Sequence, residues 1–170
     1  YKMFREMRPE TPNQLLCVDC EANGEIVFAG GFDPYAVYLW SYKTGLLLDV
    51  LSGHAGPVDL LAYSNATQTL ISCSWDKTVR VTKPFSRMLS VEELQVNDKI
   101  MALSLSKNEQ NFCIGTYKSE IHIYGVESAQ LVALIDASQQ FTRSMLTSLE
   151  LSFDGGKCYA IGNKNRVYVY

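Results

Sequence analysis

The sequence predicts an all-β protein with the architecture of a β-propeller, in which about four four-stranded blades form part of a larger propeller. Two periodic features indicate this fold. Four similar strand endings lie 42, 42 and 46 residues apart, and they close at Trp40, Thr82, Tyr124 and Tyr170. A second marker repeats with spacings of 44, 42 and 46 residues, at Cys20, Ser64, Ser106 and Ser152. A β-rich repeat in the low forties is typical of a propeller blade.

The repeats predict four blades over approximately 14–51, 57–94, 99–135 and 146–170. Expected inner strands lie at 14–20, 57–63, 99–105 and 146–152. Second strands are expected at 25–31, 68–74, 110–116 and 157–162. Third strands follow at 36–41, 78–82, 119–124 and 166–170, and outer strands at 45–51, 89–94 and 129–135. Residues 1–8 are predicted to be the outer strand of a closing or preceding blade. Four blades is the lower limit of the propeller range, so we expect these residues to be part of a longer chain, and an unusually small closed ring is the alternative.

Polar segments separate the expected inner and second strands in every repeat. They read EANGE, NATQT, KNEQN and FDGGK. Asn23-Gly24 and Asp154-Gly155 are strong hairpin signals because such pairs tolerate positive φ angles. The second strands are apolar or small, as expected for strands buried on both faces. The longer last spacing is explained by residues 137–145, which are predicted to form a surface loop.

Composition excludes several classes of function. An apolar share of 47% and a charged share of 19% are typical of a globular protein. The net charge of −3 argues against a protein that coats duplex nucleic acid. No apolar run approaches the roughly 18 residues of a membrane helix, so no membrane contact is expected. No secretory signal is visible either, and the five scattered cysteines are expected to stay reduced inside the cell.

Cys17 and Cys20 form a CxxC motif, which is half of a common zinc site. The surrounding residues alternate like a strand, and positions three apart on a strand face opposite sides. The two histidines, His54 and His122, stand apart from this motif and from each other. We therefore expect no metal, no cofactor and no small-molecule substrate.

Two segments, LSGHAGPV at 51–58 and LISCSWDKTVRV at 70–81, resemble a WD40 repeat. The resemblance implies a structural hydrogen-bonded tetrad with members at His54, Ser72 and Asp76. Its fourth member, a tryptophan, would stand where this chain has Thr82. The same three residue types also form hydrolase triads. At this spacing the WD40 resemblance implies that they join strands of one blade, and the chain is expected not to be an enzyme.

The other repeats depart from the tetrad. Lys118 and Lys164 occupy the aspartate position, while Pro12 and Val96 lie near the histidine position. Trp40 is the one expected tryptophan. These blades are therefore expected to depend on strand pairing and core packing.

Residues 24–81 resemble more closely the WD40 scaffolds of the U3 small nucleolar ribonucleoprotein in the small-subunit processome. The resemblance implies a nucleolar, non-catalytic scaffold for pre-ribosomal RNA processing. Its partners would be protein subunits of a large ribonucleoprotein assembly, with at most weak or indirect RNA contact. A scaffold of another complex, such as a coatomer-like vesicle coat or a cytoplasmic signalling adaptor, is the alternative. A propeller enzyme is a third, less supported one, because no convergent polar group lies outside the tetrad.

Aligned repeats place three aromatic residues at the same point, where the second strand meets its turn. They are Phe32, Trp75 and Tyr117, and the fourth repeat has Asn163 there. On a WD40 blade this turn faces the narrow rim near the propeller axis. Large rigid side chains at a rim are favoured anchors for partner peptides. The sequence therefore predicts a protein-binding arc at these three positions; the alternative is that each ring packs only on its own loops.

Overall fold

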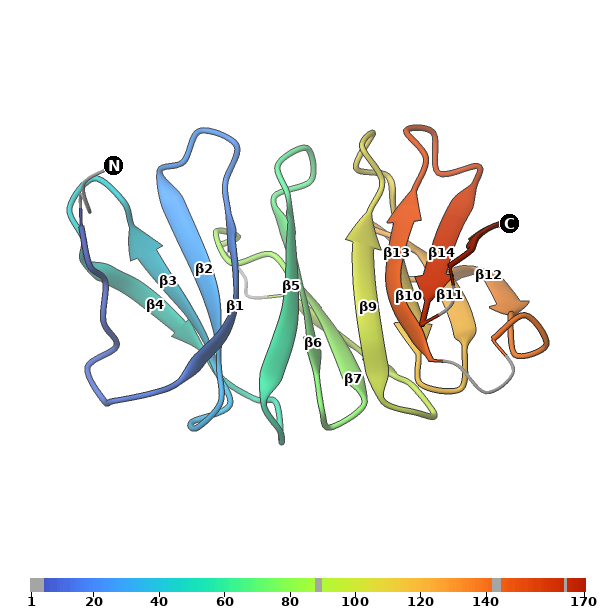
Figure 1. Cartoon of the computed structure of the whole chain (residues 1–170). Helices are drawn as coiled ribbons and strands as arrows, with labels where there is room; N and C mark the ends of the chain where they lie inside the picture. The colour runs from blue at the N-terminus through green and yellow to red at the C-terminus, as the bar shows by residue number, and fades with distance from the viewer. Residues whose placement is uncertain (1–4, 88–89, 142–144, 164) are drawn as a thin grey trace.

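Four antiparallel sheets stand side by side in a computed structural model (Figure 1). The structure describes residues 5–87, 90–141, 145–163 and 165–170. Within these ranges the chain forms fifteen strands and no helix. The inner strand of each sheet packs against the inner strand of the next, which is the arrangement of successive propeller blades. The all-β propeller prediction is confirmed.

Each sheet is a meander in which consecutive strands pair. The first contains β1 (Leu15–Cys20), β2 (Ile26–Gly31), β3 (Val37–Ser41) and β4 (Leu47–Leu51). The second contains β5 (Val58–Ser64), β6 (Thr69–Ser74), β7 (Thr78–Thr82) and β8 (Val91–Gln95). The third contains β9 (Ile100–Leu105), β10 (Asn111–Thr116), β11 (Glu120–Gly125) and β12 (Leu131–Asp136). In the part of the chain described, the fourth has β13 (Leu146–Leu151), β14 (Cys158–Gly162) and β15 (Val167–Val169).

Observed and expected strands agree to within two residues at nearly every boundary, although position 89 of the expected strand 89–94 lies outside the described residues. The prediction of a strand at 1–8 was wrong for the described residues of that segment. Residues 5–8 form no strand in the structure, and residues 1–4 lie outside the described part of the chain. The segment instead covers the first sheet, because Met7 packs against the cluster that contains Tyr38 and Trp40.

Three apolar cores fill the spaces between neighbouring sheets. The first joins Phe28 and Leu39 to Val58 and Tyr63, and Phe28 stacks on Tyr63 with ring centroids 4.6 Å apart. The second and third cores repeat this arrangement between the following pairs of sheets. Phe141 belongs to the third core and is 3% exposed. The prediction of a surface loop at 137–145 was therefore wrong for Phe141, whose ring packs against Tyr168, and for Ala137, which is also buried. Positions 142–144 of that predicted loop lie outside the described residues.

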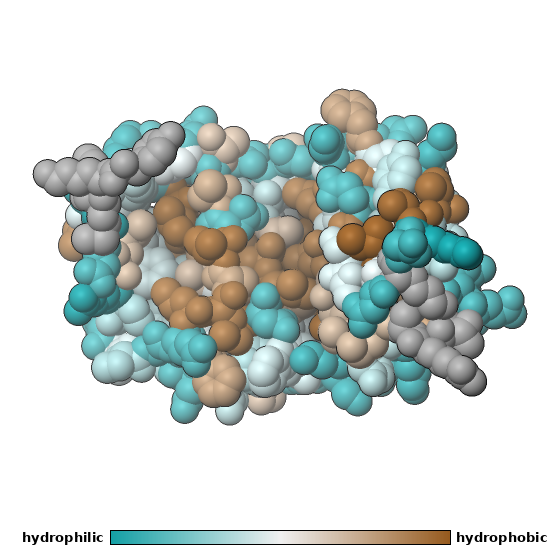
Figure 2. Space-filling view, viewed as in Figure 1, coloured by the Kyte–Doolittle hydropathy of each residue, from teal (hydrophilic) through white to brown (hydrophobic). Residues whose placement is uncertain are grey.

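Hydrogen bonds between neighbouring sheets supplement the cores. The Asp19 carboxylate accepts the backbone N–H of Tyr63, at 2.7 Å. The Glu109 carboxylate accepts the Ser64 hydroxyl and the Ala66 N–H, both at 2.8 Å. Figure 2, in the same view as Figure 1, shows apolar side chains gathered across the middle of the face where the inner strands lie. The turns above and below them carry most of the polar surface in that view.

Candidate functional site

One hydrogen-bonded chain of side chains crosses the second sheet. His54 lies in the connection between β4 and β5, Ser72 lies within β6, and Asp76 lies in the turn before β7. His54 Nε2 is 2.9 Å from Ser72 Oγ, and His54 Nδ1 is 3.2 Å from Asp76 Oδ2. Asp76 also accepts the Ala55 N–H at 2.7 Å and the Thr78 N–H at 2.8 Å. The structure thus brings together the three residues predicted for the tetrad.

Thr78 is a further member that the sequence interpretation missed. Its hydroxyl donates to Asp76 Oδ1 at 2.6 Å and lies 3.0 Å from His54 Nδ1. A signal was present in the sequence, since an aspartate commonly binds the backbone two residues later in a turn. Thr78 lies two residues after Asp76 in the motif Asp76-Lys77-Thr78.

The environment of His54 fixes its protonation state. Burial lowers the pKa of His54 and outweighs the attraction of the nearby Asp76 carboxylate. Burial alone would raise the pKa of Asp76, but hydrogen bonds from Thr78 and from the Ala55 N–H bring that pKa below its usual value. His54 is therefore neutral beside an ionised Asp76. Its Nδ1–H donates toward the carboxylate, and its Nε2 accepts the hydroxyl proton of Ser72.

Stability should fall on acidification because of His54. Its pKa is lower in the folded state, so the unfolded chain takes up the proton first as pH decreases. The stabilisation is full above the ordinary histidine value of about 6.5 and is lost as pH falls through the folded pKa. Urea unfolding at a series of pH values from 7.5 to 5 should show this loss. His54→Asn should flatten the slope, and an unchanged slope in that variant would contradict the assignment.

The network lacks the surroundings of a hydrolase site. Ser72 lies in a central strand, with Leu61 paired on one side and Arg80 on the other. Backbone N–H groups there are committed to the sheet, whereas an oxyanion hole requires donors that are free to bind a developing charge. Ser72 and His54 are also 4% and 9% exposed. This geometry favours a structural role over an acyl-transfer role.

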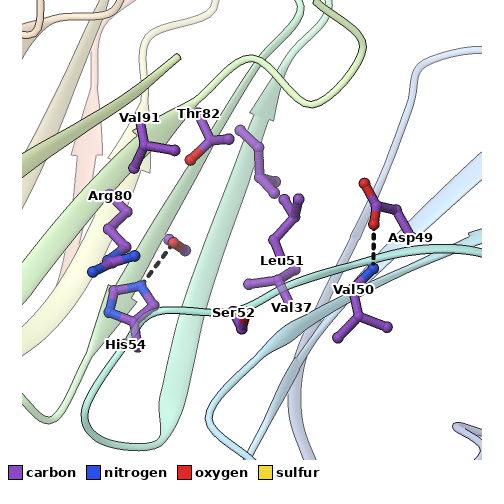
Figure 3. Close-up of a pocket in the computed structure, with 11 residues that line it drawn as sticks. Val37, Asp49, Val50, Leu51, Ser52, His54, Arg80, Thr82 and Val91 are labelled. Carbon is purple, nitrogen blue, oxygen red and sulfur yellow. Dashed lines mark hydrogen bonds between the residues drawn. The ribbon is translucent and has the colours of Figure 1, made fainter. Parts of the chain in front are cut away.

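A cavity of about 170 Å³ lies beside the network, between the first and second sheets. Val37 and Leu51 contribute from the first sheet, and Leu70, Thr82 and Val91 from the second. Figure 3 shows the His54 ring below Arg80 at one end, with Thr82 and Val91 at the other. No motif or spacing in the sequence indicated this cavity.

The three predicted rim aromatics occupy equivalent positions. Their backbone N–H groups bond to the residue just before the inner strand of their own sheet, and the acceptors are the carbonyls of Gln14, Pro57 and Lys99. The side chains of Phe32, Trp75 and Tyr117 are 39%, 45% and 53% exposed. Their turns lie at the lower edge of the molecule in Figure 1. The aromatic residues are thus exposed along one rim of three successive sheets.

Trp75 is held rigidly at the centre of this arc. Its indole N–H donates to Asp59 Oδ2 at 2.5 Å, and Lys99 Nζ lies 4.5 Å from the ring centroid. Phe32 meets the Trp75 ring edge-on, with centroids 6.0 Å apart. Burial raises the pKa of Asp59, an effect opposed by the bond from Trp75 and by the charge of Lys99. Asp59 and Lys99 are functional candidates that the sequence interpretation missed.

The cysteines are distributed through the sheets. The Cys17 thiol donates to the Val58 carbonyl at 3.4 Å, and burial raises the pKa of Cys17 to about 12. Cys20 is exposed, while Cys73, Cys113 and Cys158 are buried. Among the described residues, no group of three or more His, Cys, Asp and Glu side chains could hold a metal ion.

The described residues also contain no helix with the length and apolarity that crossing a membrane requires.

Repeated four-stranded sheets and the His54–Ser72–Asp76 network define a WD40-type propeller. A family profile described as "WD domain, G-beta repeat" matches residues 45–82. The chain therefore belongs to the WD40-repeat family.

Its similarity extends to particular proteins. Periodic tryptophan protein 2 of Saccharomyces cerevisiae is 34% identical over 186 aligned residues, which cover the whole chain and 20% of that protein. The homologue from Schizosaccharomyces pombe is 29% identical over the whole chain and 22% of its own length. The Mus musculus homologue is 37% identical over 80% of the chain and 15% of its own length. The chain thus spans about a fifth of the curated relatives it matches.

Proposed function

We propose that this chain is a non-catalytic WD40 scaffold of ribosome biogenesis that binds protein partners through its aromatic rim. The likeness to periodic tryptophan protein 2 over the whole chain supports the assignment to that group. We infer a nucleolar location within the small-subunit processome, and the resemblance of residues 24–81 to scaffolds of that particle supports this inference. Protein subunits of that ribonucleoprotein particle are the proposed partners, with weak or indirect RNA contact.

The arrangement of Phe32, Trp75 and Tyr117 is the observation that carries the binding role. Exposed aromatic rings in a row are uncommon on a monomer surface without a partner. Trp75 is already oriented by Asp59 and Lys99, so little side-chain entropy is lost when a partner covers it. Aromatic anchors that are rigid before binding commonly dominate the energy of an interface.

Strong RNA binding through the basic N-terminal segment receives no support from the contacts seen. Arg8 pairs with Glu6 at 2.7 Å, and Arg5 Nη1 donates to the Lys43 carbonyl at 2.8 Å. Lys2, the third basic residue of that segment, lies outside the described residues. These bonds favour a role for the segment in covering the first sheet.

Serine substitutions at the rim should separate binding from folding. We expect Phe32→Ser, Trp75→Ser and Tyr117→Ser together to reduce recovery of partner proteins at least tenfold, because each removes an exposed anchor. Melting temperature should fall little, since all three rings are more than a third exposed. Affinity recovery of the chain from nucleolar extract, identified by mass spectrometry and normalised to folded protein, measures the effect.

Tyr42→Ser provides a matched control, because Tyr42 is 42% exposed in the turn between β3 and β4, away from the rim. It should leave recovery unchanged. Unchanged partner recovery with a lower melting temperature in the triple variant would show that the rim is structural. Recovery with vesicle-coat subunits in place of pre-ribosomal proteins would instead support the alternative scaffold.

A further inference from the structure

Thr82 interrupts a pattern that the other repeats keep. The corresponding third-strand residues are aromatic: Trp40, Tyr124 and Tyr170. Trp40 is 2% exposed and stacks on Tyr38, while Tyr124 is 6% exposed and stacks on Phe112. At the fourth such position Thr82 is equally buried but carries no ring. The cavity between the first and second sheets lies at this side chain.

One part of the cavity wall has the chemistry of a site for a flat apolar ring, and the rest is polar, with His54, Ser72 and Arg80 among its side chains. Val37, Leu51 and Leu70 line it with aliphatic carbon. The cavity volume of about 170 Å³ accommodates a six-membered aromatic ring, because an apolar cavity of about 150 Å³ holds benzene.

One polar atom in the wall gives the site a preference for a ring that carries a hydrogen-bond donor. The Ser72 hydroxyl donates its proton to the neutral His54 ring, so its lone pairs point away from that bond. No other hydrogen bond to Ser72 Oγ is found among the described residues. An N–H group on a ring in the cavity would meet this free acceptor.

Arg80 forms the end wall and is held in place from two sides. Its Nη2 pairs with Glu93 Oε2 at 2.5 Å. On the other side its guanidinium lies against the Gly53 backbone, where a Cβ atom would stand 1.9 Å from Nη1. A planar cation in this position can stack on an aromatic ring. The opening of the cavity is bordered by the exposed residues Asp49, Val50 and Ser52.

We propose that this cavity binds the indole side chain of a tryptophan from a partner polypeptide. The indole would lie between Leu51 and Leu70 and donate its N–H to Ser72 Oγ. The position of the opening favours an indole that is carried by a polypeptide. The opening lies beside β4 and β8, which are the outer strands of their sheets. A partner segment can follow these edges while its ring enters. The site is separate from the aromatic rim, so each can fail without the other.

Nuclear magnetic resonance on the full 170-residue chain tests this binding. N-acetyl-tryptophanamide, as the peptide-like probe, should shift the amides of Ser72, Thr82 and Leu51 in a saturable way. Indole should bind about tenfold more tightly than indene, which has the same shape but no N–H, because one hydrogen bond is lost. Ser72→Ala should bring indole and indene to equal affinity.

Thr82→Trp should weaken binding of N-acetyl-tryptophanamide at least tenfold by filling the cavity from within. Thr44→Trp adds the same side chain in the exposed turn between β3 and β4, and it should leave binding intact. If Thr82→Trp does not fold, Val91→Phe at the opposite strand should block the site instead. Equal affinity for indole and indene in the wild type, or shifts that persist in the blocked variants, would overturn the proposal. The proposal would also be overturned if indole binds but N-acetyl-tryptophanamide does not, because an indole attached to a peptide backbone could then not enter the cavity.

Discussion

Replacing Asp76 with alanine is expected to lower the free energy of unfolding by about 3 kcal/mol, because hydrogen bonds to a charged acceptor are worth about 1.5–3 kcal/mol each. The carboxylate accepts bonds from His54 and Ala55 on one side and from Thr78 on the other. His54 and Thr78 are buried, so the N–H and hydroxyl of Thr78 would lose their acceptor, and His54 Nδ1 would keep only the Thr78 hydroxyl at 3.0 Å. Urea unfolding followed by circular dichroism gives the value. Asp136→Ala is the control, since the bonds that this exposed carboxylate accepts among the described residues are local ones from Ser138, and their loss should matter little.

A double-mutant cycle tests whether His54 and Asp76 act as one network. His54→Ala should cost less in the Asp76→Ala background than in the wild type, since each change removes the bond between them. We expect an interaction energy of about 1 kcal/mol, in the usual range for residues in contact. Strictly additive losses would show that the two side chains stabilise the sheet independently, which contradicts the network.

Strand positions were predictable because the same local chemistry recurs at the turns and strands of each repeat. Every turn needs polar residues or glycine, and the second strand of each of the first three sheets is largely buried on both faces, so the pattern recurs near every 42 residues. In the fourth sheet the expectation was wrong, because Tyr159 and Ile161 of β14 are exposed. The segments outside that period were not predictable. The N-terminal residues 5–8 look like a strand in composition, yet they cover the first sheet without pairing. Phe141 follows a polar stretch, and only tertiary packing under Tyr168 buries it.

Site residues were predictable where the partners lie in one repeat. Ser72 and Asp76 lie in the second sheet and His54 in the connection that leads into it, and their spacing carries the WD40 resemblance. The rim positions followed from repeat alignment as well. The cavity beside Thr82 depends on a neighbouring sheet, because Val37 and Leu51 form one of its walls. Partners across a sheet interface leave no periodic signal in the sequence.

Gly30→Ala is expected to cost about 3 kcal/mol, at the upper end of the usual range for overpacking a core. Gly30 lies in β2, where the inner strand of the next sheet comes very close. A Cβ atom there would stand 2.5 Å from the backbone oxygen of Val58 and 2.6 Å from Cys17 Sγ. Because Val58 begins β5, the clash can be relieved only by moving the second sheet away from the first. Urea unfolding measures the loss, and Gly156→Ala, with no neighbour closer than 3.3 Å, should stay within about 0.5 kcal/mol of wild type.

Gly115 allows a graded comparison, because it holds the equivalent position in the third sheet. A Cβ atom there would meet Leu146 Cδ2 at 2.4 Å and Leu149 Cδ1 at 2.9 Å. These are the ends of flexible side chains, which can change rotamer, whereas the Val58 carbonyl at Gly30 is fixed by its strand. Gly115→Ala should therefore cost less than Gly30→Ala, by about 1 kcal/mol or more. The reverse order would mean that the leucine packing between the third and fourth sheets is stiffer than the backbone contact between the first and second.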